Sequence, residues 1–288
     1  MQAIDKLIIG TAQMGLDYGI NNAEGKIEEV KSFEILDAAF SLGLRELDTA
    51  ELYGTAHEVI KKYHLSRENS FRVNTKFSHG RVVYGEELPI ENMCIDLGVE
   101  KINCVLFHTY KDFLLNRDNL NVFSVAKEKG ILKHVGVSIH SNEEALALCS
   151  EDDIDVVQLP LNLLNNKKRK EGVLTSLEES GKVIQTRSVF LQGMFFMTKF
   201  SENNVSKNLK MAILDVQRIA QKEGLSIEQL AMSYVFSQPE VNKVVVGVDN
   251  WNQLKRNIDG ISKLSEKTCT SVEEIPLGDD RYLNPALW

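Results

Sequence analysis

Two side chains able to do acid or base chemistry lie close together in residues 44–58, Leu-Arg-Glu-Leu-Asp-Thr-Ala-Glu-Leu-Tyr-Gly-Thr-Ala-His-Glu. Asp48 brings a carboxylate, and Tyr53 brings a phenol five residues later. We expect residues 44–47 to form a short strand, which places both groups in the loop that follows it. Two interpretations are open for this loop alone: Asp48 caps a turn and Tyr53 packs on the surface, or both take part in a reaction.

Two further groups of complementary type follow at the ends of later apolar runs. Lys76 stands near the end of residues 71–77, and His108 ends residues 102–108. A phenol has an unperturbed pKa of about 10, too high for an efficient proton donor near neutrality. A neighbouring ammonium favours the phenolate, and a carboxylate keeps that ammonium charged. If the four groups share one site, Tyr53 becomes an acid tuned by Lys76 and Asp48. His108 would then donate a hydrogen bond to a carbonyl oxygen, so the set suits carbonyl reduction.

The elements that must position these groups alternate along the whole chain. Short apolar runs bounded by turn residues predict strands, and apolar residues at helical spacing predict the helices between them. No Gly-x-Gly-x-x-Gly fingerprint follows any predicted strand, and no linker interrupts the pattern. We therefore predict an α/β fold, a closed (β/α)8 TIM barrel formed by residues 1–288 as a single domain, with the tail from about residue 264 unassigned. The predicted strands are residues 6–10, 44–47, 71–77, 102–108, 134–140, 156–160, 183–189 and 243–247. The predicted helices are residues 27–42, 59–63, 91–98, 122–129, 143–149, 173–180, 209–222, 227–236 and 251–258.

Composition excludes several classes of function. A net charge of -8 over 288 residues argues against a nucleic-acid partner, because such binding neutralises phosphates with basic patches. The four cysteines stand far apart, which predicts neither a zinc site nor a disulfide framework. We expect reduced thiols, no metal and a cytoplasmic protein. No apolar run is long enough to predict a signal peptide or a membrane span.

Three motifs together resemble the aldo-keto reductase family. The stretch from Gly43 to Gly54 is similar to that family's strand-two motif, Asn74-Thr-Lys supplies its lysine, and Val105-Leu-Phe-His supplies its histidine. The resemblance extends from residue 7 to about residue 257. It implies a barrel that binds a nicotinamide cofactor and reduces an aldehyde or ketone to the alcohol. It also implies Tyr53 as the general acid, a tuning pair of Lys76 and Asp48, and His108 as the group that orients the carbonyl.

The resemblance further implies a set of cofactor positions. Ser138 and Gln158 match the residues that hold the nicotinamide carboxamide, although Ile139 stands where the family usually has Asn. Arg187 replaces the Tyr that stacks on the ring in many members; its planar guanidinium can also stack, or it can pair with Glu51 instead. The full set is Thr11, Asp48, Ser138, Gln158, Arg187, Ser188, Leu191, Gly193, Gly247, Gln253 and Asn257.

The resemblance favours NADP(H), but the residues after the eighth strand leave NAD(H) open. Gly247 and Gln253 stand at the usual basic positions for the 2′-phosphate, and Asp249 would repel that phosphate. Lys255 or Arg256 could compensate.

Two other functions compete with the reductase. Lys76 could form a Schiff base in an aldolase or lyase, although the nearby Asp48 favours a charged lysine. A non-catalytic member could bind the nicotinamide as a sensor or as a subunit of a complex.

Several residues outside these motifs carry weaker expectations. We expect His57, His64 and His79 to be solvated, His140 to be a candidate for the mouth of the barrel, and the basic run 166–170 to be an exposed loop. The loops at residues 17–19, 109–120 and 192–207 would set the substrate. The aromatic residues of these loops suggest a partly apolar mouth; they are Tyr18, Phe113, Phe195 and Phe196. The terminal Trp288 could fold back over this mouth. The oligomeric state has no signature in the sequence.

Overall fold

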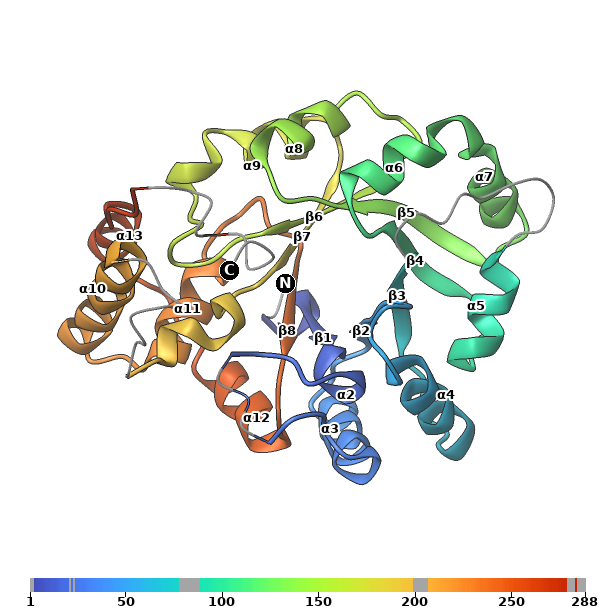
Figure 1. The fold of residues 1–288 in the computed structure, drawn as a ribbon, viewed down its shortest axis with the longest axis horizontal. Helices are drawn as coiled ribbons and strands as arrows, with labels where there is room; N and C mark the ends of the chain where they lie inside the picture. The colour runs from blue at the N-terminus through green and yellow to red at the C-terminus, as the bar shows by residue number, and fades with distance from the viewer. Residues whose placement is uncertain are drawn as a thin grey trace.

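The computed structural model describes residues 3–20, 22, 24–77, 89–198, 207–278 and 283. Within these residues, eight parallel strands close into one barrel in the order β1 to β8. Helices surround the barrel in Figure 1, which confirms the predicted (β/α)8 architecture. The strands are β1 (Leu7–Gly10), β2 (Glu46–Asp48), β3 (Arg72–Lys76), β4 (Ile102–Phe107), β5 (Leu132–Ser138), β6 (Val156–Pro160), β7 (Val183–Arg187) and β8 (Lys243–Gly247).

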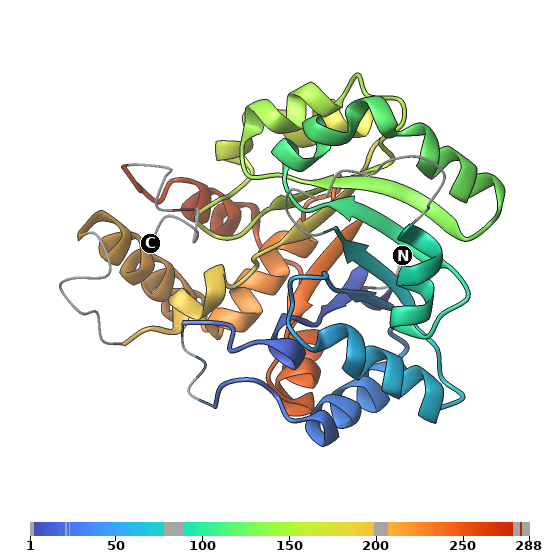
Figure 2. The same cartoon turned by 45° about the vertical axis from the view of Figure 1, so that its right-hand side comes forward.

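The helices follow the strands in the alternation that the apolar spacing predicts. Serine side chains begin two of them with capping boxes, Ser141 with Glu144 and Ser226 with Gln229. Two helices from the last third of the chain, α10 and α13, pack beside each other (Figure 2). The α-helices are α1 (Ala3–Lys6), α2 (Ala12–Gly15), α3 (Glu29–Ser41), α4 (Ala56–Ser66), α5 (Pro89–Leu97), α6 (Tyr110–Asn116), α7 (Asn121–Glu128), α8 (Asn142–Leu148), α9 (Val173–Glu179), α10 (Lys207–Glu223), α11 (Ile227–Phe236), α12 (Trp251–Asp259) and α13 (Glu266–Glu273). Short 3₁₀ helices span Arg117–Asn119, Lys168–Lys170 and Leu191–Phe196.

The strand register brings the carboxyl ends of all eight strands to one mouth. Gly10, the last residue of β1, pairs with Asp48 on one side and with Gly247 on the other. Ser138 at the end of β5 pairs with Gln158 on β6. Because parallel strands of a barrel present their ends on one face, polar residues from distant parts of the sequence meet there.

The opposite end of the barrel is held by an ion-pair cluster. Glu46 on β2 is buried and accepts hydrogen bonds from Arg72 on β3 at 2.7 Å and from Lys243 on β8 at 2.6 Å. Burial disfavours the Glu46 carboxylate, but its hydrogen bonds to Lys243 and Arg72 outweigh that cost and lower its pKa. The cluster links three strands at the end of the barrel away from the mouth.

Several local predictions need correction. The second strand begins at Glu46 and includes Asp48, so Asp48 is the last strand residue and not a loop residue. Residues 12–15 and 110–116 form short helices where loops were predicted, and the tail contains α13. These short helices lack the long apolar periodicity on which the predictions depended. The expected position of Trp288 lies outside the described residues.

Two glycines interlock the loops that follow β1 and β2. A Cβ atom on Gly15 would lie 1.8 Å from the carbonyl oxygen of Tyr53, and one on Gly54 would lie 2.3 Å from that of Gly15. Gly54 also has a φ of +52°, in the left-handed region that glycine tolerates best. The backbone of α2 is therefore in direct contact with the turn that carries Tyr53.

Candidate active site

A buried ion pair occupies the mouth of the barrel. The Nζ atom of Lys76 donates to Oδ1 of Asp48 at 2.5 Å, and the two side chains are only 2% and 4% exposed. Lys76 also donates to the carbonyl oxygen of Thr49 at 3.3 Å. Burial alone would lower the pKa of Lys76, but the charge of Asp48 and the neighbouring Tyr53 outweigh it and raise the pKa. Lys76 is therefore held as an ammonium.

Tyr53 lies close to that ammonium, and His108 lies close to Tyr53. The Lys76 Nζ atom is 5.5 Å from the centroid of the Tyr53 ring. The rings of Tyr53 and His108 meet edge to face, with centroids 6.2 Å apart and planes at 84°. The structure thus brings together all four groups that the sequence predicts to be catalytic, from β2, β3 and the residues that follow β2 and β4.

Gln158 on β6 supports this cluster. Its Nε2 atom donates to the second carboxylate oxygen of Asp48 at 2.8 Å and lies 3.3 Å from Oε1 of Gln185. Gln158 is fully buried, and its Oε1 atom finds no hydrogen-bond partner among the described residues. An unused buried acceptor at this place can receive an amide N–H from a bound group.

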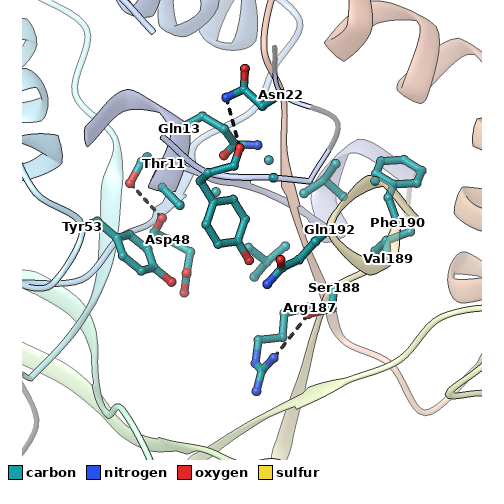
Figure 3. A pocket seen from close by; sticks show the side chains of 18 of the residues that line it. Thr11, Gln13, Asn22, Asp48, Tyr53, Arg187, Ser188, Val189, Phe190 and Gln192 are labelled. Carbon is teal, nitrogen blue, oxygen red and sulfur yellow. Dashed lines mark hydrogen bonds between the residues drawn. The ribbon is translucent and has the colours of Figure 1, made fainter. Parts of the chain in front are cut away.

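The cluster opens into a cavity of about 590 Å³. This volume lies within the range of about 300–1,000 Å³ that is usual for small-molecule sites. Figure 3 shows Asp48 and Tyr53 on one side of this space, with Arg187 and Ser188 on another. The predicted residues that line it are Thr11, Asp48, Tyr53, Lys76, His108, Ser138, Arg187, Ser188, Gly193, Gly247 and Gln253.

Three predicted cofactor residues do not line the cavity. Gln158 lies behind Asp48, to which it is hydrogen-bonded, and Leu191 is fully buried in the core. Asn257 on α12 is 1% exposed, and neither atom of its amide has a partner within the described part of the chain. A buried amide without partners is costly unless a ligand satisfies it, so Asn257 remains compatible with a binding role.

The loop after β7 has an unusual backbone. Ser188, Leu191 and Gln192 have φ values of +62°, +47° and +53°, in the left-handed region that side chains other than glycine avoid. Each such residue costs of order 1–3 kcal/mol and is typical of ligand clamps. Gln192 and Gly193 of this segment face the cavity. The loop is therefore held in a strained shape at the wall of the site.

Arg187 is fixed at the end of β7 by neutral acceptors. It donates to the carbonyl oxygen of Ile139 at 3.0 Å and to Ser188 Oγ at 3.2 Å, and one Nη atom lies 3.3 Å from the His140 ring. It makes no ion pair with Glu51 in the described structure, contrary to the alternative considered from the sequence. Burial and the charge of Arg187 lower the pKa of His140 to about 4.

The loop after β8 places one acidic residue, Asp249, and no basic residue in the cavity wall that the structure describes. The Asp249 backbone N–H donates to Oε1 of Gln253 at 2.7 Å, and both residues line the cavity. Burial and the nearby Glu24 raise the pKa of the Asp249 carboxyl. Lys255, which could have compensated for the missing basic residues, is ion-paired with Asp259 one turn along α12.

The sequence missed some lining residues and misjudged others. Gln13 and Asn22 line the cavity, but they lie in a segment without a recognisable pattern. The candidate His140 does line it, as does Tyr18. Phe196 lines it too, whereas Phe113 and Phe195 are fully buried core residues.

Two histidines and the basic run also differ from expectation. His57 Nε2 lies 3.1 Å from Thr75 Oγ1, and His64 Nδ1 lies 2.8 Å from the carbonyl oxygen of Leu97, so neither is simply solvated. In the run 166–170, Asn166 and Lys170 are buried. His79 lies outside the described residues.

Comparison with known proteins identifies a family and supports the fold. The sequence profile of the Aldo/keto reductase family matches residues 6–276. A probable aldo-keto reductase 1 from Glycine max is 23% identical, covering 96% of this chain and 88% of its own length. A D-arabinose 1-dehydrogenase from Saccharomyces cerevisiae is also 23% identical, covering 96% of this chain and 90% of its own. The structure of an aldo-keto reductase from Bacillus halodurans in its holo form superposes with a TM-score of 0.76 at 18% identity, covering 97% of this chain and 95% of that one.

The chain forms a closed α/β barrel with a polar cavity at the carboxyl ends of the strands, which is where enzymes of this architecture have their active sites. The chain belongs to the aldo/keto reductase family. It is an oxidoreductase, and the family to which it belongs uses nicotinamide cofactors to reduce carbonyl groups. None of the helices within the described ranges has the length and apolar character that crossing a membrane requires.

Proposed function

We propose that this protein reduces an aldehyde or ketone to the alcohol with a reduced nicotinamide nucleotide. The observation that carries the proposal is the buried Lys76–Asp48 ion pair beside Tyr53 at the mouth of the barrel. An ammonium held by a carboxylate next to a phenol suits proton donation to an oxygen that is gaining negative charge.

Each of the four groups has a defined part in the proposed reaction. The bound cofactor supplies the hydride. The Tyr53 hydroxyl donates its proton to the carbonyl oxygen, and the ammonium of Lys76 stabilises the phenolate that remains. Asp48 keeps that ammonium charged and in place. His108 donates a hydrogen bond to the same carbonyl oxygen, and such fixed donors lower the barrier because they already point at the developing charge.

The cofactor would extend from this cluster towards the loops after β7 and β8. Ser138 and the free Oε1 acceptor of Gln158 fit the nicotinamide carboxamide, and Arg187 would lie beside the ring. The buried amide of Asn257 fits the adenine end. The remaining proposed contacts are Thr11, Asp48, Ser188, Leu191, Gly193, Gly247 and Gln253.

The acidic loop after β8 weakens the preference for NADP(H) that the family suggests. Asp249 lies in the cavity wall with Glu24 near it, and Lys255 is engaged by Asp259. We therefore propose that NAD(H) binds at least as well as NADP(H), because the 2′-phosphate would meet negative charge.

The same site argues against a Schiff-base mechanism. A lysine nucleophile must be a neutral amine, whereas the charge of Asp48 leaves Lys76 with a raised pKa in spite of its burial. The sensor or complex-subunit alternative differs from the reductase only in turnover.

A titration with two nucleotides tests the proposal. Binding of NADH and NADPH is followed by protein fluorescence, and nucleotide oxidation is then measured with a panel of aldehydes and ketones. We expect turnover that Tyr53→Phe lowers by at least about a hundredfold without weakening nucleotide binding more than about threefold. Tight binding without turnover on any carbonyl would favour the sensor, and the absence of binding would refute both functions. An advantage of NADPH over NADH above about tenfold would refute the proposed role of Asp249.

We further propose that residues 1–288 act as one domain in the cytoplasm on a small-molecule carbonyl, without a nucleic-acid or membrane partner. The four cysteines, Cys94, Cys104, Cys149 and Cys269, are free thiols, which supports a reducing compartment.

A further inference from the structure

Arg187 carries a positive charge for which the described structure provides no carboxylate partner. Its side chain is partly buried at the cavity wall, and its acceptors are the Ile139 carbonyl, the Ser188 hydroxyl and the His140 ring. A guanidinium has five N–H donors, so donors remain after these contacts. Charged groups removed from water are normally ion-paired, but Arg187 has no ion-pair partner among the described residues.

The acidic groups near Arg187 are already used by other partners. Asp48 is bound by Lys76 and Gln158. Glu144 accepts the backbone N–H groups of His140 and Ser141 at 2.7 and 3.1 Å, as part of the capping box of α8. Asp48 and Lys76 largely cancel each other, and Glu144 acts on Arg187 only through space without an ion pair, so the charge of Arg187 is only partly compensated at this end of the cavity.

The other acidic lining residues belong to different elements. Glu228 lies on α11 and Asp249 follows β8, and neither is ion-paired with Arg187 across the described residues. His140 does not add a second charge near neutrality, because burial and the Arg187 charge keep its pKa at about 4. Its ring is therefore a neutral contact of the guanidinium.

Arg187 is also close to the proposed acid. In Figure 3 its guanidinium points into the open space that Tyr53 and Asp48 face from the other side. Electrostatic interaction links Arg187 with both Tyr53 and Tyr18. Tyr18 hydrogen-bonds with Gln192 of the strained loop, so a second phenol lines the same space. A substrate whose carbonyl reaches Tyr53 therefore lies near the unpaired cation.

We propose that Arg187 binds an anionic group of the carbonyl substrate, a carboxylate or a phosphate, and that the enzyme selects oxo acids or phosphorylated aldehydes over neutral carbonyls. This inference depends on the proposed reductase function. A planar guanidinium matches both oxyanions through paired N–H donors, which a lysine cannot do equally well. Contact of its face with a nicotinamide ring leaves the charge unneutralised, because that ring carries no negative charge. An anion on the substrate completes the pair.

Matched substrate pairs test the selection. The pairs are 4-oxobutanoate with its methyl ester, and glyceraldehyde 3-phosphate with glyceraldehyde, so that carboxylate and phosphate are examined separately. We expect the wild-type kcat/KM to favour at least one anionic member by about tenfold or more. At saturating nucleotide, Arg187→Met should lower the ratio of kcat/KM for that member to kcat/KM for its neutral partner roughly ten- to a hundredfold, because a weakened cofactor contact would affect both substrates alike. Arg187→Lys should recover part of the loss, and the exposed Arg218→Met on α10 is the control for loss of an arginine.

A binding measurement separates this inference from the reductase proposal. Succinate, which has the length of 4-oxobutanoate but cannot be reduced, is titrated calorimetrically into the wild type and into Arg187→Met. We expect its dissociation constant to rise at least about tenfold in the variant. Succinate binding that depends on Arg187 in a protein without turnover would refute the reductase and retain the anion site. Equal succinate binding by both proteins, no binding to the wild type, or equal losses for charged and neutral substrates would overturn the inference.

Discussion

Loss of the Lys76 ammonium should cost more stability than loss of both charges of its ion pair. Lys76→Met leaves the Asp48 carboxylate, which is 4% exposed, with the Gln158 amide at 2.8 Å as its remaining side-chain donor. Removing one partner of a buried pair costs about 3–5 kcal/mol, because the other charge stays buried without compensation. Since Gln158 remains, we expect a loss of about 3 kcal/mol in the free energy of unfolding.

The double variant Lys76→Met, Asp48→Asn provides the comparison. Replacing a whole buried ion pair with neutral groups of similar volume is often close to neutral for stability. The side-chain amide that replaces the carboxylate still has a carbonyl oxygen, which can accept the N–H bond from Gln158. We therefore expect the double variant to regain all but about 1 kcal/mol of the wild-type stability while staying inactive.

Urea unfolding at about pH 7, followed by circular dichroism, measures both differences. Nucleotide oxidation with an aldehyde is recorded on the same samples. This separates a loss of activity caused by the missing Lys76 ammonium beside Tyr53 from a loss caused by unfolding. If Lys76→Met costs less than about 1 kcal/mol, or if the double variant is less stable than the single one, the ion pair is not desolvated as the structure indicates.

Two further predictions concern acidity and the loop contact. Burial and Arg187 lower the pKa of His140 from 6.5 to about 4, so the unfolded chain binds this proton at higher pH than the folded protein does. Its contribution to stability is full above pH 6.5 and is lost as the pH falls towards 4, and His140→Asn should flatten this part of a urea-unfolding pH profile; an unchanged slope would contradict the lowered pKa of the ring. Gly15→Ala places a Cβ atom 1.8 Å from the Tyr53 carbonyl oxygen, so it should cost about 1–3 kcal/mol and lower kcat as the turn with Tyr53 shifts. Gly130→Ala, at a left-handed glycine with open space around it, is the control for glycine loss, and equal kcat values for the two variants would refute the role of the contact.

The sequence was sufficient to predict the barrel because several strands are short apolar runs of a buried sheet and because strands and helices alternate along the chain. Lys243-Val-Val-Val-Gly is typical: a continuous run of β-branched residues predicts a strand covered on both faces, and β8 has those bounds. The grouping of Asp48, Lys76 and His108 followed from strand ends alone, since a closed parallel barrel must bring those ends together. These inferences depend on topology rather than on side-chain detail.

Other parts of the site depend on contacts that a linear pattern does not contain. The short helix 12–15 packs against the Tyr53 turn, and its four residues show no helical periodicity of their own. Gln13, on this helix, lines the cavity. The hydrogen bond from Gln158 to Asp48 joins side chains 110 positions apart, and two of the histidines predicted to be solvated, His57 and His64, have partners from neighbouring elements. Such pairings require the three-dimensional register.

The contact between Gly15 and Gly54 has a consequence for how this enzyme could diversify. Tyr18 lies shortly after Gly15, and Tyr53 directly precedes Gly54, so the first loop and the proposed proton donor are in direct contact and should move together. An insertion or a larger side chain in the first loop would displace the acid as well as the binding surface. We expect new substrates to be acquired more readily through a change at Arg187, which makes no hydrogen bond with the first loop within the described residues. We therefore expect the first loop to be retained together with the proposed chemistry, and substrate preference to change at Arg187.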